Sequence, residues 1–321
     1  MRTINEKIIA IFCADLHLSL SPPIWRSAEP DWMLAQRATL AEITDLQREY
    51  NCPVLCAGDI FDRNKRIADG WDAPPELINY AICYLPDNMY AIPGQHDLPD
   101  HQYVDIKRSA YWTLVKAGKI KTIKPNFPIN INNLTVYGFP PNFKISSPKD
   151  DTKFNIALVH DYVWYGNHKY PNAPEEAELK GNKSQYHNKR WYGYDIVVFG
   201  DNHKGFTVGM GKTTIFNCGT LMRRKSDEIN YKPQVGLLTL SGKIIPYYLD
   251  ISKDKYIELE DGYIEPEEEL DMSAFMKELE KLGKTDLDFE DAMKQFLRTG
   301  KISREAGQII LDAMEKAAKK K

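Results

Sequence analysis

The sequence predicts an α/β fold in which two stacked sheets carry helices on their outer faces. The N-terminal third follows a βαβαβ order, which is typical of a parallel sheet with helices packed on it. After residue 117 the pattern becomes rich in strands, which requires a second sheet. Acidic and histidine side chains follow several of the apolar runs, at the strand ends where open α/β sheets place their ligand sites.

The N-terminal third alternates strands with helices. The predicted strands are Lys7–Ala14, Pro53–Ala57 and Met89–Ile92, and the predicted helices are Asp31–Glu49, Pro75–Tyr84 and Tyr103–Ala117. The first helix places four apolar residues on roughly one face, namely Leu34, Ala38, Ala41 and Leu46. Its pattern therefore predicts an amphipathic helix.

The rest of residues 1–250 is predicted as strands of a single catalytic domain. These strands are Leu134–Phe139, Asn155–Val159, Asp195–Phe199, Thr213–Phe216, Val235–Leu240 and Ile244–Leu249. Residues 251–321 form a separate region, because an acidic stretch over Glu258–Asp271 is followed by helical patterns. Two apolar stripes there, one beginning at Phe289 and one at Ala306, predict a helical hairpin appended to the domain.

Composition indicates an intracellular protein. The net charge of -3 leaves no global basic footprint, so contact with nucleic acid would depend on local patches. The five cysteines are odd in number and lack a Cys-x-x-Cys pair, which argues against a disulfide framework or a structural zinc site. The apolar run Ile8–Ala14 is too short for a membrane span, so we expect a cytoplasmic protein without a membrane partner.

A long segment between Tyr162 and Tyr194 mixes aromatic and basic residues without a clear period. Loops of this length in a compact domain are usually functional or disordered. Aromatic and basic side chains together can stack on bases and contact phosphates. The alternative is a loop held in place by its own aromatic residues, and the acidic residues Glu175, Glu176 and Glu178 reduce the positive charge.

Several side chains are candidate metal ligands because they recur in order at predicted strand ends. They are Asp15, His17, Asp59, Gln95, His160, Asp201 and His203. Residues two apart on an extended segment point the same way, so Asp15 with His17 and Asp201 with His203 can each supply two groups. Imidazole and carboxylate ligands on several strand ends suit a site for two divalent metal ions.

These motifs resemble the signature of the calcineurin-like metallophosphoesterases. The matching stretches are Asp15-Leu16-His17, Gly58-Asp59-Ile60-Phe61-Asp62, Gly94-Gln95-His96-Asp97, His160 and Gly200-Asp201-Asn202-His203. The resemblance spans about residues 7–249 and implies a four-layer αββα sandwich. Within that superfamily the chain looks most like the SbcD-type nuclease subunit of DNA repair, including phage-encoded relatives. The turn over residues 217–223 is similar to a turn that these nucleases carry after their last metal motif.

The resemblance also implies a role for each matching position. It assigns Asp15, His17 and His203 to one metal, Asp59 to a bridge between the two, and Gln95, His160 and Asp201 to the second metal. His96 matches a histidine that protonates the leaving oxygen, and Asp62 matches the carboxylate that orients it. A metal-activated water would attack phosphorus in line. The basic residues Arg223, Arg224, Lys189 and Arg190 are candidates for contact with substrate phosphates.

Two positions depart from the family pattern. Gln95 stands where the family has Asn, and Asp201 stands where it has the first His of Gly-His-x-His. A carboxylate in place of an imidazole makes the second site harder, which favours Mn²⁺, or Mg²⁺, over Zn²⁺. The other outcome of these changes is a weakened second site with little activity.

The implied function is metal-dependent hydrolysis of DNA as the nuclease subunit of an SbcCD-like complex. Its partners would be DNA and an SbcC-like ATPase, with a homodimer as a further option, in the cytoplasm of the cell or of a phage host. One alternative is a phosphodiesterase or phosphatase that acts on small molecules or phosphoproteins. A second alternative is a degenerate member that binds DNA or its partner without cleaving.

Overall fold

The computed structural model describes residues 6–62, 66–67, 70–71, 73–149, 153–180, 184–186 and 191–257, leaving out the side chains of residues 66, 67, 70 and 71. The predicted C-terminal helical hairpin and the candidate phosphate contacts Lys189 and Arg190 lie outside the described residues.

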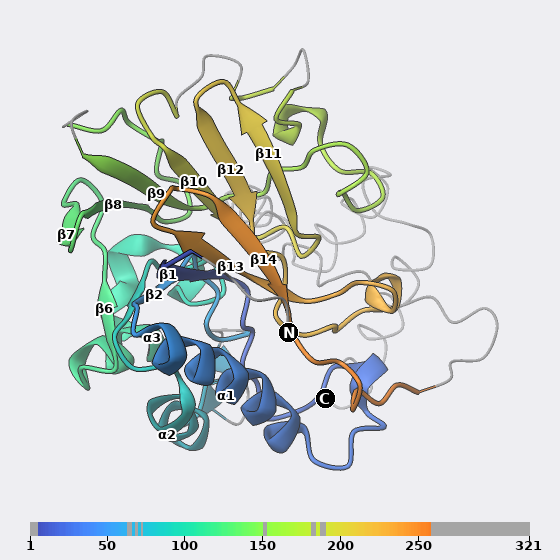
Figure 1. The fold of residues 1–321 in the computed structure, drawn as a ribbon. Coiled ribbons are helices and arrows are strands. Elements are labelled where there is room, and N and C mark those ends of the chain that lie inside the picture. The colour runs from blue at the N-terminus through green and yellow to red at the C-terminus, as the bar shows by residue number, and fades with distance from the viewer. Residues whose placement is uncertain are drawn as a thin grey trace, which may run out of the picture. The chain divides into compact units, whose positions relative to one another are not determined.

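Two six-stranded sheets stack on each other in the described part of the chain (Figure 1). The strands of the first sheet are, in spatial order, β14 (Ile244–Tyr248), β13 (Gln234–Thr239), β1 (Ile8–Cys13), β2 (Val54–Cys56), β5 (Met89–Ala91) and β6 (Ile120–Thr122). Those of the second are β11 (Phe206–Met210), β12 (Thr213–Asn217), β10 (Ile196–Gly200), β9 (Phe154–His160), β8 (Leu134–Phe139) and β7 (Ile129–Ile131). A separate hairpin pairs β3 (Arg66–Ile67) with β4 (Gly70–Trp71).

The central strands of both sheets are parallel. In the first sheet β1, β2, β5 and β6 run in one direction, and in the second β8, β9, β10 and β12 do so. The outer strands β13, β14, β11 and β7 pair antiparallel with their neighbours. Because parallel strands end at the same edge of a sheet, the loops that follow them are brought together there.

Three α-helices cover the outer face of the first sheet (Figure 1), namely α1 (Trp32–Tyr50), α2 (Pro75–Tyr84) and α3 (Ala110–Lys116). Short 3-10 turns occupy Ile24–Arg26, Pro99–His101, Tyr103–Arg108, Glu175–Ala177 and Ser226–Glu228. The predicted helix Tyr103–Ala117 is split, because Ser109 is extended and its hydroxyl accepts from the Trp112 amide to begin α3. No helix of the described residues is long and apolar enough to cross a membrane.

The buried face of α1 differs from the one that the apolar pattern predicted. Leu34 is 58% exposed, whereas Trp32, Leu40 and Ile43 are buried. Gln36 is also fully buried on this face, because its amide accepts from the Ser19 N–H at 3.0 Å and donates to the Ser19 carbonyl at 2.9 Å. A polar side chain can be buried when its hydrogen bonds are satisfied inside the protein. A pattern of apolar residues does not include it and therefore misplaces the buried face of the helix.

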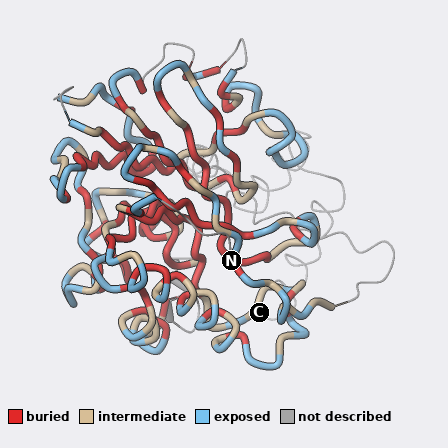
Figure 2. The backbone as a smooth tube through the Cα atoms, in the orientation of Figure 1, coloured by how far each residue is buried: buried red, intermediate tan, exposed pale blue. Residues whose placement is uncertain are grey.

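The core has three parts, and Figure 2 shows buried backbone concentrated in the two sheets. One apolar cluster lies between the sheets and includes Phe12, Leu158 and Phe216. A second joins the first sheet to the helices. The third covers the other face of the second sheet, where aromatic residues such as Trp191 and Tyr194 pack in place of a helix. The α/β sandwich is therefore confirmed, but in the described residues only one sheet has α-helices on its outer face.

Five strands were absent from the sequence prediction, namely the two of the β3–β4 hairpin and three strands of the six-stranded sheets. β6 and β7 are only three residues long, and β11 lies at the edge of its sheet. Short strands give too few alternations to be recognised, so pairing with longer neighbours decides their conformation.

Residues 250–257 are anchored to the domain by a buried ion cluster. Asp254 accepts from Arg26 Nη2 and from Arg223 Nη2, each at 2.8 Å. Both guanidinium groups also lie over the Tyr256 ring, at 5.3 and 4.8 Å from its centroid. The Ile257 amide donates to the Trp25 carbonyl at 3.1 Å. The chain therefore stays attached to the sandwich for several residues past the predicted boundary at 250.

We expect Asp254→Asn to lower the free energy of unfolding by about 3 kcal/mol. The buried Arg223 guanidinium would lose its carboxylate partner, whereas Arg26 would keep its ion pair with Glu29. Urea denaturation followed by circular dichroism measures this. The control is Asp45→Asn, whose partner Arg48 is exposed and whose loss should leave stability nearly unchanged. Equal stability of the two variants would show that the cluster does not anchor residues 250–257.

Candidate metal centre

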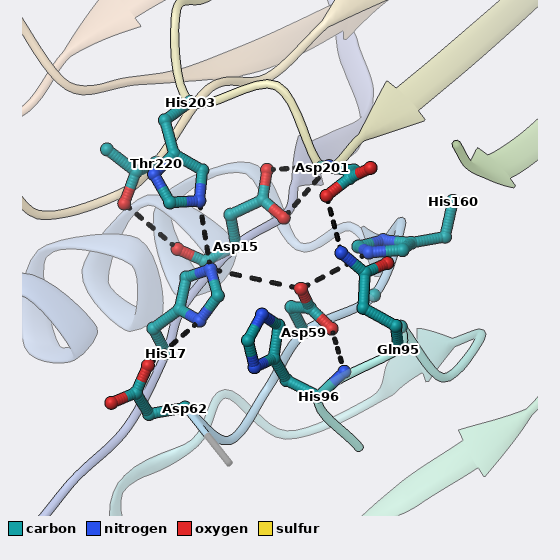
Figure 3. Close-up of polar contacts among 12 residues, drawn as sticks. Asp15, His17, Asp59, Asp62, Gln95, His96, His160, Asp201, His203 and Thr220 are labelled. Atoms are coloured by element: carbon teal, nitrogen blue, oxygen red, sulfur yellow. Dashed lines mark hydrogen bonds and ion pairs between the residues drawn. The ribbon is translucent and has the colours of Figure 1, made fainter. Parts of the chain in front are cut away.

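Loops that follow parallel strands of both sheets converge at one edge of the sandwich (Figure 3). Asp15 and His17 follow β1, Asp59 follows β2, Gln95 and His96 follow β5, His160 ends β9, and Asp201 and His203 follow β10. The structure thus brings together all seven predicted metal ligands and His96. The first sheet provides five of these eight side chains and the second provides three.

Four of these residues have a backbone conformation that is rare outside glycine. Their φ angles are 53° for Asp15, 46° for His17, 53° for Asp59 and 85° for Asp201. A left-handed conformation costs free energy in a residue with a side chain, and it persists only where the surroundings enforce it. Here the loops after β1 and β2 remain paired, since Asp15 and His17 donate to the Gly58 and Asp59 carbonyls at 3.0 Å.

Three of the histidines have a protein contact at Nδ1, which leaves Nε2 facing the centre (Figure 3). His160 Nδ1 lies 2.7 Å from the Ala57 carbonyl, and His203 Nδ1 lies 3.2 Å from Glu228 Oε1. His17 Nδ1 lies 3.4 Å from Asp62 Oδ1. Contacts of this kind fix the ring orientation of metal-binding histidines. His17 Nε2 and His203 Nε2 are consequently only 3.1 Å apart.

Asp59 lies at the middle of the cluster. One carboxylate oxygen accepts from the His96 amide at 3.0 Å, and the other lies 3.2 Å from His160 Nε2. Burial alone would raise the pKa of Asp59, but His160 and His96 hold it below its usual value. A β-carbon at Gly94 would overlap the Asp59 carboxylate, so only glycine allows this close approach.

The buried groups fit divalent cations. Burial raises the pKa of the fully buried Asp15 to about 7 and lowers that of His17 to about 3. His160 Nε2 is buried near Asp59 without hydrogen-bonding geometry. Buried carboxylates without a cation are costly, and a metal ion would favour both ionised Asp15 and neutral His17. The donor set therefore fits bound metal better than it fits an empty pocket.

Three overlapping groups have ligand atoms within 4.8 Å of one another, namely Asp15 with His17 and His203, Asp15 with Asp59 and His160, and His17 with Asp59 and His96. The first group is the set predicted for the first metal. The second contains Asp59 and His160, as predicted for the second metal, but it also contains Asp15, which the resemblance assigned to the first. The third includes His96, which the resemblance assigned to proton transfer. The ring of His96 lies edge-on to that of His17, with centroids 5.1 Å apart.

The two unusual positions, Gln95 and Asp201, contact each other directly. Gln95 Nε2 donates to Asp201 Oδ1 at 2.6 Å, and the Asp201 amide donates to both carboxylate oxygens of Asp15 at 3.0 and 3.1 Å. Both positions were assigned to the second metal, and this contact couples them directly. The pair lies beside Asp59 and His160, on the side of the second predicted metal (Figure 3).

Asp62 has different neighbours from those that the resemblance implied. Its carboxylate contacts His17 and forms an ion pair with Arg224 Nη2 at 2.8 Å, and no contact joins it to His96 among the described residues. Arg224 also donates to the His17 carbonyl at 2.9 Å, so its guanidinium lies at the site. Both contacts are made to Asp62 Oδ1. The role of Asp62 in orienting His96 therefore has no contact to support it here and stays a prediction.

The other candidate phosphate contact, Arg223, is a structural residue in this arrangement. Its side chain is mostly buried and is held by Asp254 and by the Ile229 carbonyl, which accepts at 2.7 Å. A guanidinium with these partners has little capacity left for a substrate phosphate.

The sequence analysis gave no role to Asp97, which holds two metal loops together. Its carboxylate accepts from the amides of Ile60, Phe61 and Gly94 at 2.9 to 3.2 Å. Burial and the nearby charge of Asp59 raise its pKa to about 7. The signal that could have identified Asp97 is its position next to His96 in the motif Gly94-Gln95-His96-Asp97.

Glu228 was also missed, because it lies 25 residues beyond the histidine that it contacts. It accepts from the amides of Arg224 and Lys225 as well as lying against His203. These contacts and His203 lower the pKa of Glu228 to about 2 although burial opposes this.

Four of the eight described tyrosine and tryptophan residues of the long segment are buried. Trp164, Tyr186, Trp191 and Tyr194 are buried. This agrees with the interpretation of a loop held by its own aromatic side chains. Tyr162 and Tyr170 differ from them, since Tyr162 is only half-buried and Tyr170 is 45% exposed.

We expect Asp201→His and Gln95→Asn to change metal affinity non-additively, because the two side chains share a hydrogen bond. Asp201→His should raise affinity for Zn²⁺ relative to Mn²⁺, since imidazole is a softer ligand than carboxylate. Calorimetric titration of the single and double variants with each metal measures both effects. If the changes in metal affinity were strictly additive, they would contradict the inference that Gln95 and Asp201 bind the same ion.

Comparison with known structures finds only weak overall similarity. An archaeal phosphodiesterase is 13% identical with a TM-score of 0.38, covering 75% of this chain and 99% of its own. Sulfate thiohydrolase SoxB of Thermus thermophilus is 12% identical with a TM-score of 0.46, covering 78% and 57%. Phosphopantetheinyl hydrolase of Mycobacterium tuberculosis is 12% identical with a TM-score of 0.41, covering 82% and 100%. A comparison with curated protein sequences found no match.

A family model gives the clearer result. The model described as calcineurin-like phosphoesterase matches residues 10–205, which is more than half of the chain and includes every residue of the cluster in Figure 3 from Asp15 to His203. The strand order, the converging loops and this match agree, and the chain belongs to the calcineurin-like phosphoesterase family.

Proposed function

We propose that this chain is a metal-dependent nuclease that hydrolyses phosphodiester bonds in DNA, as an exonuclease or endonuclease. The supporting observation is the turn over residues 217–223, which carries the resemblance to SbcD-type nucleases and contacts the metal loop. Leu221 and Thr220 both donate to the Asp15 carbonyl, at 3.3 and 3.2 Å. The next residue, Arg224, reaches the site itself.

The residues of the site have separate roles in the proposed reaction. Asp15, His17 and His203 would hold one divalent ion, Gln95, His160 and Asp201 the second, and Asp59 both. When bound, such ions polarise a phosphoryl oxygen and activate water. His96 is partly exposed, and it would give a proton to the leaving oxygen. Arg224 presents guanidinium charge to the phosphate while Asp62 holds it in position.

The acidic second site favours Mn²⁺, or Mg²⁺, over Zn²⁺. Replacing an imidazole ligand by Asp201 adds a hard oxygen donor and a negative charge. The amide oxygen of Gln95 is a further hard donor that fits the same ions.

The same centre would serve a phosphodiesterase or phosphatase for small molecules or phosphoproteins. It would also persist in a degenerate member that binds without cleaving. The deciding experiment compares Mn²⁺-dependent hydrolysis of labelled DNA, bis-p-nitrophenyl phosphate and p-nitrophenyl phosphate. The nuclease hydrolyses DNA and the diester, a phosphatase prefers the monoester, and a non-cleaving member hydrolyses none.

We expect Asp59→Ala to remove both bound metals and hydrolysis, because its carboxylate lies 3.9 Å from His17 Nε2 on one side and 3.2 Å from His160 Nε2 on the other. Metal analysis of the purified protein beside a rate assay checks this. A variant that retained two ions would refute the bridging position.

We expect His96→Ala to behave differently and to keep its metal content while turnover falls about 100-fold or more, as loss of a general acid does. The same metal analysis and rate assay apply. Loss of one ion from this variant would instead assign His96 to the His17 and Asp59 group as a ligand.

We further propose that the C-terminal region engages an SbcC-like ATPase in the cytoplasm of the cell or of a phage host. The metal ligands and the anchored residues 250–257 all precede it. A chain ending near Asp271 is therefore expected to fold, bind metal and hydrolyse bis-p-nitrophenyl phosphate, but not to co-purify with the ATPase. Retained co-purification would exclude this docking role, and lost metal binding would make the region part of the catalytic core.

A further inference from the structure

Two tyrosines of the long segment, Tyr162 and Tyr170, pack against each other, and neither is fully buried. The ring centroids of Tyr162 and Tyr170 are 4.6 Å apart, with the planes inclined by 49°. The Tyr170 amide donates to the Tyr162 hydroxyl at 3.3 Å, so the pair is joined by a polar contact as well as by packing. Tyr170 remains 45% exposed. Exposed aromatic surface that is held in place is a feature of binding sites.

The pair is fixed to the metal centre from both ends. Tyr162 follows the ligand His160 by two residues. Asn202, which lies between the ligands Asp201 and His203, is 2% exposed and donates to the Val163 and His168 carbonyls at 2.7 and 2.8 Å. The segment between the tyrosines is thereby attached to the loop that carries Asp201 and His203.

Electrostatics agree with this position. The exposed Lys169 lies beside Tyr170, but its ammonium group is over the Trp164 ring at 4.4 Å. Glu175 and Glu176 are exposed shortly after it. Lys204 Nζ donates to the Lys169 carbonyl at 3.2 Å and forms an ion pair with Asp227 at 2.8 Å. The two lysines next to the pair are therefore both engaged by other groups of the protein.

We propose that Tyr162 and Tyr170 form a stacking platform for an unpaired base of single-stranded nucleic acid close to the scissile phosphate. We infer a base as the ligand because an exposed aromatic ring can stack on any base but cannot form an ion pair with a phosphate. A base inside a duplex has both faces covered by its neighbours, so the platform selects single strands or frayed ends. This inference rests on the proposed function in that DNA must reach the metal centre.

The test scans one abasic position through a short single-stranded DNA and measures kcat/KM with Mn²⁺. Wild-type protein should lose about tenfold when the abasic residue occupies the platform, and little elsewhere. Tyr170→Ala should lose about tenfold on intact DNA and nothing more on that abasic substrate, because the two changes remove the same contact. Tyr170→Phe should keep the wild-type pattern, since the ring is retained.

The control is Tyr192→Ala, which removes another exposed tyrosine of the segment and should match wild type. Equal sensitivity of wild type and Tyr170→Ala to the abasic scan would overturn the platform, as would a Tyr170→Phe variant as defective as Tyr170→Ala. Fluorescence anisotropy with labelled strands repeats the comparison without catalysis. If no DNA is cleaved, the proposed function fails, while base-dependent binding that Tyr170→Ala abolishes would still support the platform.

Discussion

The structure depends on burying three carboxylates, Asp15, Asp59 and Asp97, where the two sheets meet. All three are at most 1% exposed, and an ionised carboxylate without partners is unstable in such a place. Backbone amides supply the partners, and they come from loops after other strands, as when Asp201 donates to Asp15. The hydrogen bonds that make burial tolerable therefore also set the spacing between the loops. Local φ strain at these loops is maintained by the same contacts.

The two halves of the centre differ in chemistry. One half is rich in imidazole, with His17 and His203 facing each other and each held by a carboxylate. In the other, an amide and a carboxylate, Gln95 and Asp201, accompany a single histidine. Because softer and harder ligands prefer different ions, the two positions need not have equal affinity or the same metal. The asymmetry is a property of this chain's residues within a shared fold.

Sequence alone predicted the sandwich, most strands and the residues that converge, because buried strands and ordered motifs leave strong local patterns. It failed where a contact joins distant segments. The buried face of α1 depends on Gln36 bonding to Ser19, and the neighbours of Asp62 depend on where Arg224 lies after folding. No periodicity encodes such partners. Glu228 is a further example, since nothing near it in sequence shows that it holds His203.

The position of β1 in the first sheet has a consequence for biosynthesis. β1 pairs on one side with β2, which follows soon along the chain, and on the other with β13, more than two hundred residues later. Until β13 leaves the ribosome, β1 exposes an unpaired edge that invites association with other chains. Contacts this distant in sequence also slow folding. The first sheet can thus be completed only after β13 has been synthesised, and until then the nascent edge of β1 needs shielding.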